Sequence, residues 1–345
     1  MCVLKRYFLA KRPTIVDVAR LAGVSKATVG RVVAGQHDIV SVDTRQRVQD
    51  AIIQLGYERN AIAGSLRTDK TYMIALLIPD ITNPFWPAVA RGVQDTLEKY
   101  DYTVVTVNSD WDTGLETKYL RMVRRNRFDG IIINPTNSLM TNFSDMDIPL
   151  VVLSNGDDYP DFDTVSSDTE TAVQESLDYL YELGHRRIGL IAGLSTRRKL
   201  TTRYQSYLAF LVRKHLPLDK DIVVHGDFTI QAGMEAMKHL LSLLEPPTAI
   251  FAANDILAIG AMQTAQAAGW QVPEDISIIG MDDIFAASTT YPPLTTVAKP
   301  KYKLGVKAAE LLLAQLQGGP ANGPEHHKLR CELLKRGSTA VPMDT

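Results

Sequence analysis

The sequence predicts a small all-α head followed by a larger α/β core built from two similar lobes. Residues 18–33, VARLAGVSKATVGRVV, place two short apolar runs around a glycine-containing step, which is typical of two helices joined by a tight turn. Beyond residue 69, short apolar runs rich in β-branched residues alternate with helical segments. That alternation predicts parallel sheets wrapped by helices, and the strands fall into two sets before and after about Asp168.

The charge of the chain is divided unevenly between head and core. The net charge of the 345 residues is −2, yet residues 1–70 hold 12 Lys and Arg against 6 Asp and Glu, which leaves 25 against 33 for the remainder. A basic head on an acidic body predicts that a polyanion binds the head alone.

Composition excludes several classes of protein. The two cysteines, Cys2 and Cys331, lie at opposite ends and indicate neither a disulfide framework nor a metal site. No run approaches the roughly 18 apolar residues that cross a bilayer, and the basic N-terminus lacks a small-residue cleavage site. We therefore expect a cytoplasmic, nucleoid-associated protein with no metal, no cofactor and no membrane partner.

The first segment of the head predicts a short helix that stops at a glycine. Thr14 and Asp17 have the spacing of a capping box, and Gly23 would end the helix. Its apolar face consists of Val18, Ala19, Leu21 and Ala22.

Two further helices complete the head. Ser25 is a good N-cap for the second helix, in which Val29, Val32 and Val33 face inward. Lys26, Ala27, Thr28 and Arg31 then point away from the core. Ser41 caps a third helix with an apolar stripe of Val48, Ile52, Ile53 and Leu55.

Such a helix-turn-helix lays its second helix in the DNA major groove, with the N-terminal residues of that helix at the base edges. The alternative is a three-helix bundle without a partner. The outward Lys26 and Arg31 and the basic charge of the head disfavour that alternative.

The segment TIVDVARLAGVSKATVGRVV, followed by VSVDTRQRVQDAIIQLGYERNAIAGSL, resembles the DNA-binding head and hinge of the lactose-repressor and purine-repressor (LacI) family of bacterial transcription regulators. The resemblance continues through IALLIPDITNPFW, FDGIIINP, LGHRRIGLIAG, AIFAANDILAIGAM, ISIIGMDD and PPLTTVAKP. It implies a helix-turn-helix domain at residues 1–59, a hinge helix and linker at 60–70 and an effector-binding core at 71–345.

The resemblance also implies that the core is similar to periplasmic binding proteins, with two doubly wound parallel-sheet lobes. Lobe 1 would comprise about 71–166 and 298–327, and lobe 2 about 167–297 and 328–345. The chain would cross between the lobes near 165–168, 295–299 and 325–329. A ligand would bind in the cleft at the carboxyl ends of the strands.

For DNA, the resemblance places Lys26, Ala27 and Arg31 at base edges, and Arg31 is the first choice for specificity because arginine commonly binds guanine in a bidentate manner. Thr14 and Thr28 fall at phosphate-contacting positions. Leu66 matches a residue that wedges into the minor groove. The full set of expected DNA-binding residues is Thr14, Ser25, Lys26, Ala27, Thr28, Arg31, Asn60 and Leu66.

This sequence departs from the family pattern in both parts of the DNA-binding region. Gly30 stands where a serine that touches the DNA backbone is usual, and Ala34 stands where an asparagine is common. Gly64 and the missing proline before Asn60 depart from the usual hinge. Because glycine lowers helix propensity, the second helix and the hinge helix are expected to be less firm than in relatives.

For the effector, the resemblance implies contacts from Asp80, Phe85, Trp86, Arg197, Arg203, Phe228, Asn254 and Asp282. Aromatic faces suit the C–H surface of a sugar or a planar base, although a buried Phe or Trp is more often part of a core. Charged groups at strand ends make poor core residues. The alternative to ligand binding is that Arg203 and Asp282 form an ion pair with each other. Asp255 is a secondary candidate for the cleft, and its alternative role is to cap the helix that it begins.

No catalytic residues are expected. The sequence has no G-x-S-x-G, P-loop or H-E-x-x-H motif, and no Gly-rich dinucleotide turn after its first predicted strand. The sequence is therefore not expected to encode an enzyme.

We expect a transcriptional regulator, a repressor, that binds a pseudo-palindromic operator in double-stranded DNA as a homodimer. A small effector in the interlobe cleft, a sugar or a derivative, would control its DNA affinity allosterically. The dimer would form through lobe 1, around helices 86–99 and 112–126. The alternatives are a solute-binding protein without a regulatory role and a regulator with a vestigial pocket.

Overall fold

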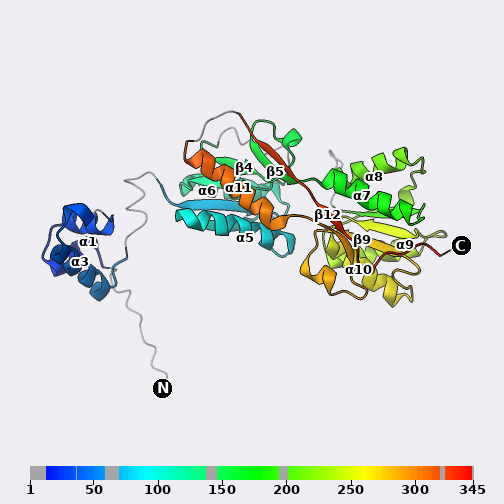
Figure 1. Ribbon diagram of the computed structural model, residues 1–345, viewed down its shortest axis with the longest axis horizontal. Coiled ribbons are helices and arrows are strands. Elements are labelled where there is room, and N and C mark those ends of the chain that lie inside the picture. The colour runs from blue at the N-terminus through cyan, green and yellow to red at the C-terminus, as the bar shows by residue number, and fades with distance from the viewer. Residues whose placement is uncertain are drawn as a thin grey trace, which may run out of the picture. The chain divides into compact units, whose positions relative to one another are not determined.

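The computed structural model describes residues 13–35, 37–58, 70–136, 146–193, 201–318 and 323–343. The chain separates into two units, Met1–Thr71 and Tyr72–Thr345. The first is the head, shown in blue in Figure 1, and the second is the core; each is described by itself.

The head contains helices α1 (Ile15–Ala22), α2 (Lys26–Val33) and α3 (Val42–Leu55), with a 3-10 turn at His37–Ile39. Hydrogen bonds at the helix starts explain where they begin. The Thr14 amide and hydroxyl donate to the Asp17 carboxylate at 2.9 and 2.7 Å. The Ser25 hydroxyl oxygen accepts from the Thr28 amide at 3.1 Å. Gly23 ends α1 with a φ of +65°, a conformation that suits glycine.

One shared core holds these helices together, formed by Val18, Ala19, Ala22, Val29, Val32, Val48 and Ala51. Leu21 and Ile53, which were expected on the apolar faces, do not belong to this core. Leu21 is 46% exposed and Ile53 is 79% exposed. In α3 the buried stripe runs through positions 48, 51, 52 and 55, the i, i+3, i+4, i+7 pattern. Ile53 is one residue past that stripe, about 100° around the helix, and Leu21 is displaced in the same way from the face of α1.

The core contains two six-stranded sheets in its described residues. The first has the order β11-β5-β4-β3-β1-β2 and is parallel throughout. The second has the order β12-β10-β9-β8-β6-β7, and only β12 runs antiparallel to its neighbour. The strands of the first sheet are β1 (Met73–Ile78), β2 (Thr103–Asn108), β3 (Gly130–Ile133), β4 (Leu150–Val152), β5 (Asp163–Ser167) and β11 (His326–Leu329). Those of the second are β6 (Ile188–Ala192), β7 (Val223–His225), β8 (Ala249–Ala252), β9 (Ser277–Met281), β10 (Thr295–Ala298) and β12 (Glu332–Leu334).

Helices cover both faces of each sheet. In lobe 1, α5 (Phe85–Leu97) and α11 (Lys301–Leu316) lie side by side on one face, and α6 (Thr113–Arg125) packs on the other (Figure 1). In lobe 2, α9 (Ile230–Leu241) and α10 (Asp255–Ala267) cover one face, and α7 (Thr169–Glu182) and α8 (Thr202–Arg213) the other. Short 3-10 turns lie at Glu98–Tyr100, Gly156–Asp158, Lys220–Ile222 and Phe285–Ser288.

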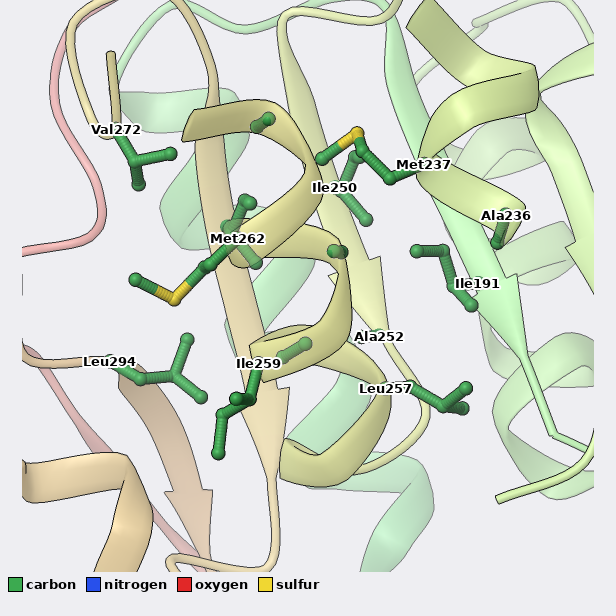
Figure 2. Close-up of a cluster of buried hydrophobic side chains, with 14 of the residues drawn as sticks. Ile191, Ala236, Met237, Ile250, Ala252, Leu257, Ile259, Met262, Val272 and Leu294 are labelled. Carbon is green, nitrogen blue, oxygen red and sulfur yellow. The ribbon is translucent and has the colours of Figure 1, made fainter. Parts of the chain in front are cut away.

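The helices expected at 86–99 and 112–126 are α5 and α6, which begin within one residue of the expected starts and end two residues and one residue earlier. Figure 2 shows the core of lobe 2, where Leu257 and Met262 of α10 and Met237 of α9 belong to one buried cluster with Ile191 and Ile250 of the sheet. The apolar runs of these strands are buried on both sides, as a parallel sheet between two helical layers requires. This architecture confirms the predicted fold class.

The chain passes between the two sheets three times: after β5, after β10 and after β11. The last crossing was expected near 325–329. In the structure β11 still pairs with β5 at Leu329, and β12 begins at Glu332, so this crossing lies at residues 330–331. Lobe 1 accordingly extends beyond its expected end at 327. No helix in the described part of the chain is both long and apolar enough to span a membrane.

Candidate functional site

A cavity of about 290 Å³ lies between the two lobes of the core. Residues that directly follow strands form much of its wall: Asn134 follows β3, Leu153 and Ser154 follow β4, and Lys299 follows β10. Because parallel strands end at the same edge of a sheet, the two lobes bring their carboxyl ends to one cleft. The expected residues that line this cavity are Phe85, Trp86, Arg203, Phe228, Asn254 and Asp282.

A buried ion pair lies at the cavity. Asp282 is 4% exposed, and its carboxylate lies 3.3 Å from the Lys299 ammonium, whose side chain is 8% exposed. The same ammonium lies 5.1 Å from the centre of the Phe85 ring. Burial lowers the pKa of Lys299, the nearby Arg203 charge lowers it further, and Asp282 opposes the shift.

Lys299 was not among the residues expected at the site. The alternative of an ion pair between Arg203 and Asp282 is wrong for this structure, because in the described residues the carboxylate pairs with Lys299 instead. A signal did exist in the sequence, since a lysine that directly follows the buried run TTVA lies at a strand end beside the cleft.

The backbone that presents Asp282 adopts an unfavourable conformation, with φ of +112° at Asp282 and +51° at Asp283. Several contacts hold it there. The Lys301 ammonium donates to the carbonyl oxygens of both residues. The Asp283 carboxylate accepts from Arg336 at 2.6 Å. A strained segment held by so many contacts is typical of a functional site.

Asp255, the first residue of α10, contacts the segment that follows Asp282 and Asp283. Its carboxylate accepts from the Ile284 amide at 2.8 Å and from the Thr296 hydroxyl at 2.5 Å. Burial, together with the nearby charge of Asp282, raises the pKa of Asp255 to about 8. The carboxyl is therefore mostly protonated and neutral at pH 7.

Asn254, and not Asp255, is the N-cap of α10, since its side-chain oxygen accepts from the Leu257 amide at 2.9 Å. Its side-chain nitrogen is buried and has no hydrogen-bond partner among the residues that the structure describes. Because Asn254 lines the cavity, this nitrogen is a donor available for a bound molecule.

Arg203 lies in the first turn of α8. Its Nε donates to the sulfur of Met281 at 3.3 Å, and its guanidinium carbon lies 6.0 Å from the centre of the Phe228 ring. Burial lowers the pKa of Arg203, and the nearby Asp282 charge opposes the shift. No ion pair to Arg203 forms among the residues that the structure describes.

Aromatic rings from both lobes meet at the cavity. Trp111, which follows β2, lies 5.9 Å from Phe228 of lobe 2 with an interplanar angle of 33°. Phe228 in turn packs on Gly193, where a Cβ would lie 2.1 Å from its ring. In lobe 1, Phe85 and Trp86 pack edge to face at 4.9 Å, and Trp86 belongs largely to the core.

Trp111 is a second residue that the sequence reasoning missed. It lies in the segment NSDW, immediately after a strand of lobe 1, which is the position where cleft residues gather. Of the expected residues, Asp80 does not line the cavity, because its carboxylate accepts from the Thr82 amide at 2.8 Å and from the Thr82 hydroxyl. Arg197, Asn60 and Leu66 lie outside the described residues.

The head exposes the side chains expected to face DNA. Lys26, Ala27 and Arg31 on α2 are exposed, and Ser25 and Thr28 hydrogen-bond to one another at the start of the helix. Thr14 is exposed at the start of α1, where its hydroxyl donates a hydrogen bond to the Asp17 carboxylate. In the described part of the chain, no group of three or more His, Cys, Asp or Glu side chains could hold a metal ion.

A three-helix head with an exposed basic helix, followed by two parallel-sheet lobes around a cavity, defines a helix-turn-helix protein with a periplasmic-binding-protein-like core. Comparisons with known proteins agree. Residues 14–60 match the family described as bacterial regulatory proteins, lacI family, and residues 177–339 match the periplasmic binding protein-like domain. The HTH-type transcriptional repressor CytR of Escherichia coli (strain K12) is 36% identical over 336 residues, which cover 95% of this chain and 97% of CytR.

The chain therefore belongs to the lacI family of bacterial regulatory proteins. It is a DNA-binding transcriptional regulator and not an enzyme. Its fold is similar to that of the lac repressor dimer bound to operator and the anti-inducer ONPF, with a TM-score of 0.84, 26% identity and coverage of 96% of this chain and 100% of that one. It is also similar to a LacI family regulator from Enterococcus faecium with bound ribose, with a TM-score of 0.69, 32% identity and coverage of 78% and 99%.

Proposed function

We propose that the protein is a repressor that binds a pseudo-palindromic operator as a homodimer, and that a small effector in the interlobe cleft controls its affinity for DNA. The observation that carries this proposal is the capped second helix of the head, which turns Lys26, Ala27 and Arg31 outward. The cavity in the core of the same chain supports the regulatory half of the proposal.

On the DNA side, each outward residue has a distinct contribution. Arg31 is exposed, and among the described residues it has no ion-pair partner that would compete with a base. An arginine in the major groove binds guanine O6 and N7 with two hydrogen bonds. The small Ala27 allows the helix to approach the bases, and Lys26 supplies positive charge. Ser25 and Thr28 lie at the helix start, where hydroxyls and the backbone amides bind phosphates.

Two heads on one operator require twofold symmetry, so the DNA-bound form is a homodimer. The similar lac repressor structure is a dimer bound to operator. We place the interface on lobe 1, around α5 and α6. The hinge, which includes Asn60 and Leu66, would connect the head at residues 1–59 to the core.

On the effector side, a sugar or sugar derivative suits the cavity. The Asp282 carboxylate accepts from hydroxyls, the unpaired Asn254 nitrogen donates to them, and the rings of Trp111 and Phe228 cover C–H faces. The Enterococcus faecium regulator, of similar fold, contains bound ribose.

Two other functions are less well supported. A solute-binding protein without a regulatory role has no use for an exposed basic helix-turn-helix, and residues 14–60 match a family of regulators. A regulator with a vestigial pocket would have no reason to keep an unpaired buried donor at Asn254 beside a strained Asp282.

Two measurements test the proposal. Selection from random duplexes should recover a pseudo-palindrome, and its titration with the purified protein should show two subunits per site. A thermal-shift screen against sugars, sugar derivatives, nucleosides and amino acids should give a hit that stabilises the protein as RT ln(1 + [L]/Kd).

Asp282→Ala should abolish that hit, whereas Glu170→Gln, which removes an exposed carboxylate at the same cavity, should preserve it. Selection without any enriched sequence would contradict the DNA half of the proposal. A hit that survives Asp282→Ala would contradict the placement of the effector.

A further inference from the structure

The buried charges of the cavity do not balance. Three charged side chains lie at its interior: Asp282 carries one negative charge, and Lys299 and Arg203 carry two positive charges. Asp282 pairs with Lys299 at 3.3 Å, while Arg203 donates a hydrogen bond to the neutral sulfur of Met281. One positive charge in this interior therefore has no carboxylate of its own.

Other ionisable groups near the cavity do not supply the missing negative charge. Asp255, behind Asp282, has a pKa raised to about 8 and is mostly neutral at pH 7. Asp158 is half-buried, as Arg203 is, but it has an interaction of its own, and it forms no ion pair with Arg203 or Lys299 among the described residues. Glu170 and Lys328 are exposed. Counted over the six lining residues the charges sum to zero, but exposed charges are screened by water and salt, whereas the buried ones are not.

The two cations, half-buried Arg203 and nearly buried Lys299, are both disfavoured in the cavity. Desolvation lowers the pKa of each, and the charge of Arg203 lowers the pKa of Lys299 further. An uncompensated buried cation is unfavourable, and a bound anion that accepts hydrogen bonds from it removes that penalty. Neutral hydroxyls alone would leave the imbalance in place.

We propose that the effector is a small acid, in which a carboxylate or phosphate group binds Arg203 and Lys299. The rest of the molecule carries hydroxyls that bind Asp282 and the free nitrogen of Asn254. The chemical class is an acidic polyol of monosaccharide size, which suits a cavity of about 290 Å³. This inference rests on the proposed function, because it specifies the ligand of the same cleft.

The test is calorimetric titration of the full-length protein, without DNA and at constant ionic strength, so that general screening is the same throughout. The first probes are inorganic phosphate and acetate, each compared with chloride. The second are matched sets that differ in charge: glucose, gluconate and glucose 6-phosphate, and ribose with ribose 5-phosphate. The carboxylate and phosphate members show which acidic group the site prefers.

We expect phosphate or acetate to bind saturably at one site per chain, and the acidic member of a set to bind more tightly than the neutral one. Lys299→Gln and Arg203→Gln should each weaken that binding about tenfold or more, because each removes a charge-assisted hydrogen bond. Lys299→Arg keeps the charge and should retain binding. Lys328→Gln, the loss of an exposed lysine at the same cavity, should change the affinity by less than about twofold.

The inference is overturned if phosphate and acetate bind no better than chloride to the wild-type protein, which requires no variant to fold. It is also overturned if a neutral sugar binds at least as tightly as its acidic counterparts, or if folded Lys299→Gln binds the anion as the wild type does. These outcomes are independent of the proposed function. A protein that binds its operator and responds to a neutral sugar would keep the regulator and refute only the acidic effector.

Discussion

At the scale of single residues, Arg31 has the clearest expected effect. It is exposed on the second helix of the head, from which we propose that it reaches a base pair. We expect Arg31→Ala to weaken operator binding by about 1 to 3 kcal/mol and to relax the preference at one base pair in each half-site. Fluorescence anisotropy against the operator and a panel of single base-pair variants measures both effects.

The control for Arg31 removes the same charge from the core instead of the head. Lys238→Ala, on α9 of the core, should leave operator affinity unchanged. An equal loss for Arg31→Ala on every duplex in the panel would mean that Arg31 contacts only phosphate and carries no sequence information.

Asp255 gives a prediction about pH. Its pKa is 3.8 unfolded and about 8 folded, so the folded protein holds a proton that the unfolded chain releases between these values. By linkage, the group contributes stability below about pH 4, and this contribution is lost as the pH rises toward 8. An Asn at this position has no charge; its oxygen can accept from the Ile284 amide and its nitrogen can donate to the Thr296 hydroxyl oxygen. Asp255→Asn should therefore gain stability relative to wild type as pH rises from 5 to 9.

Urea unfolding of wild type and Asp255→Asn across that pH range measures the difference in free energy directly. Glu182→Gln, which removes an exposed carboxylate at the end of α7, serves as the control and should follow the wild-type profile. Parallel profiles for Asp255→Asn and wild type would show that the carboxyl is already ionised in the folded protein.

At the scale of elements, the sequence predicted more of the fold than of the cleft. The starts of the head helices could be predicted because Ser25 and Ser41 cap locally, through amides three residues on. Ile53 could not be placed from its neighbours, since the face of α3 is decided by where α1 packs. For the same reason the end of β11 depends on its pairing with β5, which is distant in sequence.

The residues of the cleft were harder to predict, because their roles depend even more on partners that are distant in the sequence. Asp282 and Asn254 were predicted because they follow recognisable strands within motifs shared with the family. Lys299 and Trp111 were missed because their importance comes from partners on other segments, Asp282 and Phe228. Asp80, at a strand end like the others, accepts hydrogen bonds from Thr82 and does not line the cavity.

Both lobes use glycines to bring a pair of helices together. In lobe 2 a Cβ at Gly260 of α10 would lie 2.2 Å from the Ile230 carbonyl oxygen of α9, and in lobe 1 a Cβ at Gly305 of α11 would lie 2.1 Å from the Val89 carbonyl oxygen of α5. Backbone atoms cannot move aside as a flexible side chain can. We therefore expect Gly260→Ala to force the helices apart and to destabilise the core by about 1 to 3 kcal/mol.

A matched substitution in the head separates crowding from helix propensity. A Cβ at Gly30 of α2 would have no neighbour within 4 Å, so Gly30→Ala should stabilise the head helix by about 0.5 to 1 kcal/mol. Calorimetric unfolding of both variants checks the pair. Equal effects of the same sign would mean that propensity, and not the close approach of α9 and α10, governs both positions.

At the scale of the whole molecule, the cleft is where a ligand can influence the arrangement of the core. The lobes are joined by three connecting segments and meet through Trp111 and Phe228 beside the cavity. Lys299 and Lys301 lie on one of these segments and contact Asp282 from it. A molecule that replaces Lys299 as the partner of Asp282 therefore acts on the connection between the lobes itself.

Such a ligand can control DNA binding only by having different affinities for the DNA-competent and incompetent states. The factor by which the effector changes the operator Kd must then equal the factor by which the operator changes the effector Kd. We expect this factor to lie between roughly 5 and 150, the usual range for allosteric coupling. Titrating operator with and without saturating effector, and effector with and without saturating operator, measures it twice.

Two variants show where that coupling resides. Asp282→Ala should remove effector binding and leave the operator Kd of the free protein unchanged, because the head does not include the cleft. Trp111→Ala removes a contact between the lobes and one ring from the effector site, while sparing Asp282, Lys299 and Arg203. It should therefore bind the effector more weakly but measurably, with a coupling factor closer to one. If the wild-type factor is one in both titrations, the cleft binds its ligand without regulating DNA binding. If Trp111→Ala leaves the factor unchanged, the signal passes through the connecting segments alone.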